Sequence, residues 1–151
     1  MTSLLPSMLR SGTLLAINLL YLMVWGFAGI GKLEAGMPPW FDDKFGKTFL
    51  AKFPGLTAAF WALTGAEVIA FALAAIALVR GDFVRRRPPR WLGATLVWSL
   101  FVFLMLGFGQ WLTGEFNGAF QQFAYFGVTL AALLWLDRPG AMLDNNSTKR
   151  G

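Results

Sequence analysis

The stretch LTAAFWALTGAEVIAFALAAIALV, residues 56–79, decides the fold class of this chain. Its single ionisable side chain is Glu67, near the middle of the stretch. A helix needs about 20 mostly apolar residues to cross the hydrocarbon core of a bilayer. Residues 56–79 are therefore predicted to form a membrane-spanning α-helix.

Three further apolar stretches meet or approach this length, at residues 13–33, 91–112 and 118–136. The first is longer than the apolar core of a typical signal peptide, so we expect a retained signal-anchor helix. Charged residues make up only 14% of the chain, whereas soluble domains usually carry about 25%. The sequence predicts an all-α integral membrane four-helix bundle, one domain over residues 1–144, followed by a disordered tail over residues 145–151.

The basic residues predict the orientation of the bundle. The short loop between the second and third stretches holds five arginines against one acid, Asp82; they are Arg80, Arg85, Arg86, Arg87 and Arg90. Such loops stay on the cytoplasmic side, so four spans place both termini there, in a bacterial inner membrane. Residues 34–55 then lie outside, where mixed aromatic and charged residues predict a short amphipathic helix in the interface. The net charge of +5 reflects this asymmetry, and nucleic-acid binding is not expected.

The chain contains no Cys and no His. This excludes thiolate nucleophiles, disulfide exchange, His-ligated haem and the usual zinc sites within the chain itself. We expect no metal, no covalent cofactor and no stand-alone redox activity.

Glu67 is the leading candidate for a functional residue, because an ionisable side chain in mid-membrane is costly and marks a functional site by default. Counting about 1.5 Å per residue along each helix places several polar side chains in two layers. The residues expected at the depth of Glu67 are Tyr21, Ser99 and Tyr125, and those expected nearer the outer face are Lys32, Gln110, Gln121 and Gln122. Either the layers bind a small molecule or a proton, or they are polar contacts that hold the helices together.

Small residues recur every fourth position in residues 56–79, at Ala58, Ala62, Ala66, Ala70 and Ala74. A face of small side chains lets a neighbouring helix approach closely. We expect this stripe to be a helix-packing seam, with Glu67 at its flank.

Three short motifs carry a family resemblance. They are GFAGIGKL at residues 26–33, GAE at residues 65–67 and RPGAMLD at residues 138–144. With these motifs the chain resembles the DoxX/DoxD-like family of small four-helix membrane proteins. The resemblance implies a membrane subunit linked to redox enzymes, since one branch of that family serves thiosulfate:quinone oxidoreductase. Relatives that handle thiols need cysteines, which this chain lacks.

The function predicted from these observations is an inner-membrane subunit that anchors a redox partner and binds quinone or a lipid-like molecule near Glu67. In that hypothesis Glu67 handles a proton, Tyr21 or Tyr125 bonds a carbonyl, and Lys32 and Gln122 position the head group. An alternative is a purely structural subunit that docks through an aromatic surface, comprising Phe101, Phe103, Phe108, Phe116, Phe120, Phe123 and Phe126. A second alternative is a small-molecule transporter that works as an oligomer. Expected partners are membrane lipid and other subunits or further copies of the chain.

Overall fold

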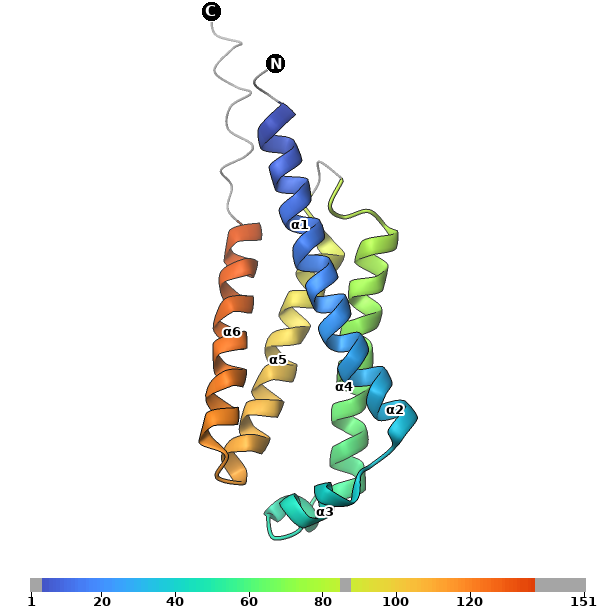
Figure 1. Ribbon diagram of the computed structural model, residues 1–151, viewed down its shortest axis with the longest axis vertical. Helices are drawn as coiled ribbons and strands as arrows, with labels where there is room; N and C mark the ends of the chain where they lie inside the picture. Colours follow the sequence, from blue (N-terminus) through green and yellow to red (C-terminus); the bar gives the residue numbers. More distant parts are fainter. Residues whose placement is uncertain (1–3, 85–87, 138–151) are drawn as a thin grey trace, which may run out of the picture.

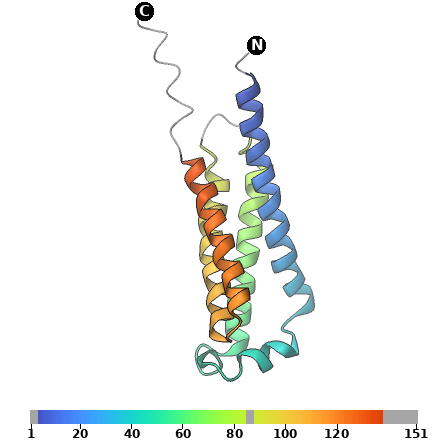
Figure 2. The ribbon, with the colours of Figure 1, turned by 60° about the vertical axis from the view of Figure 1, so that its left-hand side comes forward.

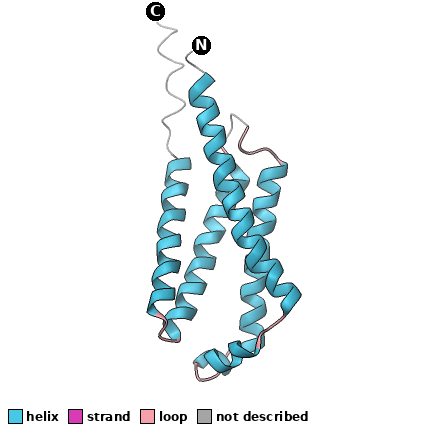
Figure 3. Cartoon of the chain, in the orientation of Figure 1, coloured by secondary structure: helices cyan, strands magenta, loops and turns pink. Residues whose placement is uncertain are grey.

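A computed structural model describes residues 4–84 and 88–137, and every regular element in these two ranges is helical (Figures 1 and 3). The elements are α1 (Leu4–Trp25), the π-helix η1 (Gly26–Ile30), α2 (Gly31–Ala35), α3 (Pro39–Phe45), the 3₁₀-helix η2 (Phe49–Ala51), α4 (Leu56–Val79), α5 (Arg90–Leu112) and α6 (Phe116–Leu136). The predicted all-α fold class is therefore confirmed.

Within these two ranges, four helical stretches are long and apolar enough to cross a membrane: Met8–Ala35, Leu56–Val79, Arg90–Leu112 and Phe116–Leu136. The second span has the predicted bounds, and the third and fourth begin slightly earlier than predicted. The first differs most, because α1 begins at Leu4 rather than near residue 13. Arg85–Arg87, the predicted tail at 145–151 and the motif at 138–144 lie outside the described residues.

The four long segments pack in chain order, with α1 against α4, α4 against α5 and α5 against α6. The start of α1 and the end of α6 lie at one end of the bundle, and α3 lies at the other (Figures 1 and 2). We call these the terminal end and the α3 end. The α1–η1–α2 segment stops short of the α3 end. The residues between α2 and α3 cover the remaining distance, beside the first turns of α4. This offset determines which side chains meet in the bundle.

The alanine stripe forms a packing seam only toward the terminal end. Ala70 and Ala74 are fully buried, whereas Ala58 and Ala62 are exposed and Ala66 is intermediate. Four residues turn an α-helix by about 400°, so each i, i+4 step moves a side chain about 40° around the axis. The five alanines therefore do not all lie on the buried face of α4: the two nearest the terminal end are buried and the two nearest α3 are exposed. The prediction of one continuous seam is wrong. The residues that α4 buries are Phe60, Thr64, Glu67, Ala70, Ala74 and Ala77.

Tryptophan and polar side chains connect the helices within the bundle. Trp98 of α5 donates from Nε1 to the carbonyl of Ala66 in α4 at 2.8 Å. Asp82, in the loop before α5, accepts hydrogen bonds from the backbone N–H groups of Trp91 and Leu92 at 2.8 and 3.1 Å. A carboxylate at this position stabilises a helix start, because the first N–H groups have no partner within the helix.

The short helix predicted in the loop between the first two spans is confirmed as α3. Its Phe41 and Phe45 are buried, and the Phe41 ring lies 5.3 Å from the Phe60 ring of α4. Asp42, Asp43 and Trp40 lie on its exposed side. The apolar face of α3 therefore covers the end of α4.

The phenylalanines predicted as one docking surface are divided between core and surface. Phe103 is buried and Phe126 is intermediate, while the remaining five of that set are exposed. Phe103 instead packs on Trp25 of α1, with ring centroids 4.9 Å apart.

Candidate functional site

Glu67 forms an ion pair with Lys32 in the middle of the bundle. Lys32 Nζ lies 2.6 Å from both carboxylate oxygens of Glu67, and it donates to each. The Glu67 side chain is only 1% exposed, whereas that of Lys32 is 29% exposed. An isolated charge at such a position is very unfavourable, so the contact with Lys32 is what allows a charged carboxylate in the core.

The π-helix η1 brings Lys32 to Glu67. A Cβ added to Gly29 would lie 3.1 Å from the backbone nitrogen of Val68, so the absence of a side chain allows η1 and α4 to approach closely. Gly26 packs against the Phe71 ring in the same way. Single turns of π-helix insert one residue into an α-helix and are frequent at functional sites. The extra residue changes the direction in which the following side chains, including Lys32, project.

The depth calculation placed Lys32 in a layer separate from Glu67, and that placement is wrong. The first helix is offset toward the terminal end of the bundle, so its last turns lie beside the middle of α4 rather than at its end (Figure 1). Counting from a predicted helix end assumes that all spans start and stop at one plane. The sequence contains no direct signal of this offset.

The hydroxyl groups predicted around Glu67 have other partners. Tyr21 and Thr129 share a hydrogen bond of 2.5 Å, which connects α1 to α6. Ser99 accepts from Trp25 Nε1 at 2.8 Å and donates to the Thr95 carbonyl at 2.7 Å. Tyr21 lies about three helical turns before Lys32, so the offset that brings Lys32 to Glu67 moves Tyr21 toward the terminal end. The Ser99 hydroxyl is turned toward Trp25 of α1 instead of Glu67.

Tyr125 and the predicted glutamines also have separate environments. The Tyr125 ring is half exposed and lies 5.7 Å from the Phe103 ring. Gln121 is exposed, and Gln122 Oε1 is buried with no hydrogen-bond partner among the described residues. Gln110 is the glutamine that belongs to a cluster, together with Lys44. A ligand-binding role for each of these residues stays a prediction.

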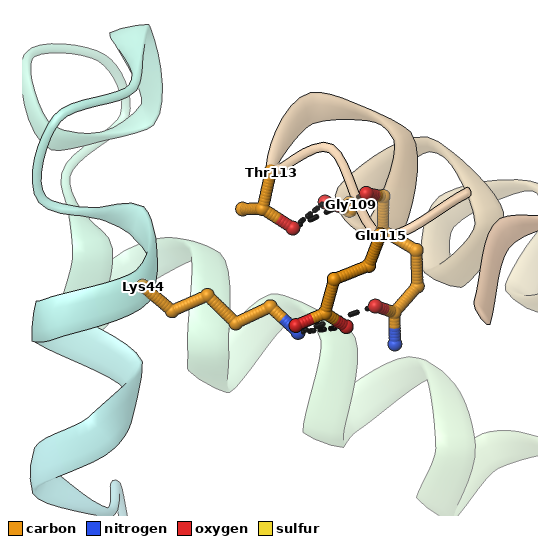
Figure 4. Close-up of polar contacts among 5 residues, drawn as sticks. Lys44, Gly109, Thr113 and Glu115 are labelled. Carbon is orange, nitrogen blue, oxygen red and sulfur yellow. Dashed lines mark hydrogen bonds and ion pairs between the residues drawn. The ribbon is translucent and has the colours of Figure 1, made fainter. Parts of the chain in front are cut away.

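Lys44 of α3 forms the second cluster, at the α3 end (Figure 4). Its Nζ donates to Glu115 Oε2 at 2.7 Å and to Gln110 Oε1 at 3.2 Å, and so joins α3 to the end of α5 and to the turn that follows. Gly114, with φ of +75°, forms this tight turn and places Glu115 opposite α3. Lys44 Nζ also lies 5.9 Å from the Trp40 ring centroid, within the range of cation–π attraction.

A pocket with a volume of about 430 Å³ lies between α3, α4 and α5, and we call it the α3 pocket. Its walls are mainly aromatic and aliphatic, and its polar groups are two lysines and one glutamine. The lining residues are Lys32, Trp40, Phe41, Lys44, Phe45, Leu50, Pro54, Ala59, Phe60, Ala62, Leu63, Met105, Leu106, Phe108, Gly109 and Gln110. Lys32 therefore lines the pocket while its ammonium group contacts Glu67.

Besides three threonines, the buried polar residues of the described chain that were not predicted from the sequence include Asn18 and Asp82. Asn18 of α1 is buried beside α4, where its amide can donate to the Ala74 carbonyl at 3.0 Å. Asp82 is buried beneath the start of α5. A single Asn in a long apolar stretch, and an Asp beside several arginines, were the available signals. In the described ranges, no group of three or more acidic residues could hold a metal ion.

The fold and this site define a class: a helical bundle whose described residues include four helices long and apolar enough to cross a membrane, with a buried ion pair and a pocket of amphipathic character at one end. No family model, no curated protein and no solved structure matches the chain. The resemblance to the DoxX/DoxD-like family therefore stays a prediction from the three motifs.

Proposed function

We propose that this protein is a membrane subunit that binds an amphipathic small molecule in the α3 pocket. The observation that carries the proposal is the pocket itself, with apolar walls and its polar groups gathered from α2, α3 and α5. Small-molecule sites are typically mostly apolar cavities of about 300–1,000 Å³ with a few convergent polar groups. The α3 pocket has both properties.

The position of the pocket supports a ligand drawn from the membrane. It is bounded by two predicted spans, α4 and α5, and by the amphipathic helix α3. A molecule with an apolar body and a polar head could place its body against Phe60 and Leu106 and its head near Lys44. Quinones and lipid-like molecules both belong to this class.

The wider setting follows from the sequence. The arginine-rich loop predicts that the terminal end lies in the cytoplasm, and hence that the α3 end lies on the outer side of a bacterial inner membrane. The resemblance to the DoxX/DoxD-like family suggests that the chain belongs to a redox-linked complex. In that complex this chain anchors a partner enzyme, and electrons come from that partner. Glu67, paired with Lys32 beside the pocket, would then be the group that handles a proton.

The exposed phenylalanines favour a second candidate, a structural subunit without a ligand. Phe101 and Phe108 of α5 and Phe116 and Phe120 of α6 are all exposed. Most residues of α6 are not buried within the described chain, so this helix offers a large surface to lipid or to another subunit. This candidate requires no occupant in the α3 pocket.

The test is to purify the protein in mild detergent from its native membrane and to identify co-purifying small molecules and proteins by mass spectrometry. Ala62 lines the pocket and is exposed, so Ala62→Phe should fill the pocket without disturbing the core and should displace the bound molecule. Ala58→Phe is the matched control, because Ala58 is exposed on the same helix but does not line the pocket.

An amphipathic molecule that is retained by the wild-type protein and by Ala58→Phe, but lost from Ala62→Phe, would support the proposal. A stoichiometric partner protein with no bound small molecule would reject it in favour of the structural subunit. Retention of the same molecule by both variants would also reject the α3 pocket as its site.

A further inference from the structure

We infer that the α3 pocket selects amphipathic molecules with an anionic head group, and that Lys44 binds this head group by leaving Glu115. This inference rests on the proposed function and narrows its ligand class. The expected head group is a carboxylate or a phosphate on an apolar body.

The charges that line the pocket are all of one sign. Among the described residues that line it, Lys32 and Lys44 are the two ionisable ones, and none is acidic. The carboxylates of Glu67 and Glu115 contact the lysines from outside the pocket wall. The polar side chains that a ligand in the pocket meets are therefore two lysines and the Gln110 amide, which favours a negative head group over a positive one.

The two lysines differ in how firmly their present partners hold them. Glu67 is almost fully buried and contacts Lys32 through both oxygens, so Lys32 cannot leave without stranding a buried carboxylate. Glu115 is 53% exposed, and water can hydrate its carboxylate if Lys44 departs. Exposed ion pairs contribute little to stability, so Lys44 is the lysine that can exchange partners at low cost.

The surroundings of Lys44 would strengthen its contact with a ligand anion. The Lys44 side chain is only 20% exposed, and its ammonium lies near the rings of Trp40 and Phe45. Charge-assisted hydrogen bonds are stronger where water is partly excluded. Gln110, which accepts from Lys44 in the present arrangement, also offers an amide N–H₂ that can donate to the same anion.

The experiment measures binding of three probes with the same alkyl chain to the full-length protein in neutral nanodiscs: hexadecyl phosphate, palmitate and hexadecanol. The wild-type protein should bind at least one of the two acids more tightly than the alcohol. Lys44→Gln should weaken acid binding about tenfold, the usual size of a lost charge-assisted hydrogen bond, and should leave the alcohol unaffected. Glu115→Gln should tighten acid binding, because it removes the group that competes for Lys44.

Control variants separate charge from folding. Lys47→Gln removes an exposed lysine of the same loop that does not line the pocket, so it should not change any affinity. Lys44→Arg keeps the charge and should retain most of the acid preference. Ala62→Phe should weaken the binding of all three probes. Tighter binding of hexadecyl phosphate than palmitate would identify phosphate as the preferred head group, and the reverse order would identify carboxylate.

Two outcomes would overturn the inference, and they differ in their meaning. Equal affinity for acids and alcohol, abolished by Ala62→Phe and insensitive to Lys44→Gln, would reject the anionic head group while the proposed pocket stands, as expected for a neutral quinone. No binding of any probe, together with no molecule co-purifying from native membranes, would reject both the inference and the proposed function.

Discussion

At the residue scale, the Lys32–Glu67 pair determines how the middle of the bundle tolerates charge. The two residues are distant in sequence, and their side chains meet because the first helix ends beside the middle of α4. The ion pair offsets the cost of burying the Glu67 carboxylate, so it has a structural role whether or not it also takes part in ligand binding. A mutational cycle can separate these two roles.

We predict that Lys32→Met lowers the free energy of unfolding by about 3–5 kcal/mol, because it leaves Glu67 buried without its partner. The double substitution Lys32→Met with Glu67→Leu should recover most of this loss, since two apolar side chains replace the pair. Thermal unfolding in mild detergent, followed by circular dichroism, measures both changes.

Lys47→Met is the control for removing a lysine, because Lys47 is exposed. A Lys32→Met protein as stable as the wild type would contradict the assigned structural role of the pair. If the double variant is stable but no longer retains the molecule that co-purifies with the wild type, the pair contributes to binding as well as to folding. If it retains the molecule, the pair acts only as a contact between helices.

At the scale of elements, the π-helix η1 joins α1 and α2 and sets their distance from α4. A larger side chain at Gly29 would contact Val68 closely and force it to shift, whereas a Cβ added at Gly31 would lie in open space. The two glycines are near neighbours in the sequence but have opposite packing requirements. They provide a matched pair for testing whether close approach, rather than glycine content, matters here.

We predict that Gly29→Leu destabilises the protein by about 1–3 kcal/mol, because its side chain would push η1 away from α4. The same change should weaken the Lys32–Glu67 contact, so Lys32→Met should cost less in this background than in the wild type. Gly31→Leu should leave stability nearly unchanged. Chemical denaturation in mild detergent compares the variants, and equal stability of Gly29→Leu and Gly31→Leu would contradict the prediction.

At the scale of the whole molecule, the start of α1 and the end of α6 share one end of the bundle, and α3 occupies the other (Figure 2). This arrangement agrees with an even number of membrane crossings. The side of the membrane that each end faces is predicted by the arginines near the terminal end. The chain has no native cysteine, so single introduced cysteines can report the orientation without background.

We predict that a cysteine introduced by Asp43→Cys, on the exposed side of α3, reacts with a membrane-impermeant maleimide in intact cells. A cysteine introduced by Ser147→Cys, near the C-terminus, should react only after the membrane is permeabilised. Labelling is read by the mass shift of the purified protein. The opposite pattern would reverse the orientation and would place the α3 pocket on the cytoplasmic side.

Much of the architecture was predictable because it depends on local composition. Residues 56–79 were predicted as a helix to their observed ends, since an apolar run of that length has its backbone groups satisfied only within a helix when lipid surrounds it. The helix α3 was predictable for a similar reason, from the alternation of aromatic and charged residues. Glu67 stood out because a charge within such a run is rare.

The composition of the site was not predictable to the same degree. Sequence reasoning selected Glu67, Lys32 and Gln110, but it did not select Lys44 and Glu115 as a pair or foresee the α3 pocket. Tyr21 and Ser99 were expected beside Glu67 and lie elsewhere. The pattern along each helix indicates depth, while contact also requires the rotation of each helix and its offset along the bundle.

The sequence by itself determined that this chain has four helices of membrane-spanning length, a charged group in the second of them and a short amphipathic helix after the first. Those properties follow from length and polarity within single segments. The tertiary structure alone decided that Lys32 neutralises Glu67, that Lys44 joins α3 to the α5–α6 turn, and that a pocket remains between them. The reason is that these contacts depend on the offset and rotation of whole helices, which are set by packing between helices, as at Gly29 against Val68, and not by the composition of any one segment.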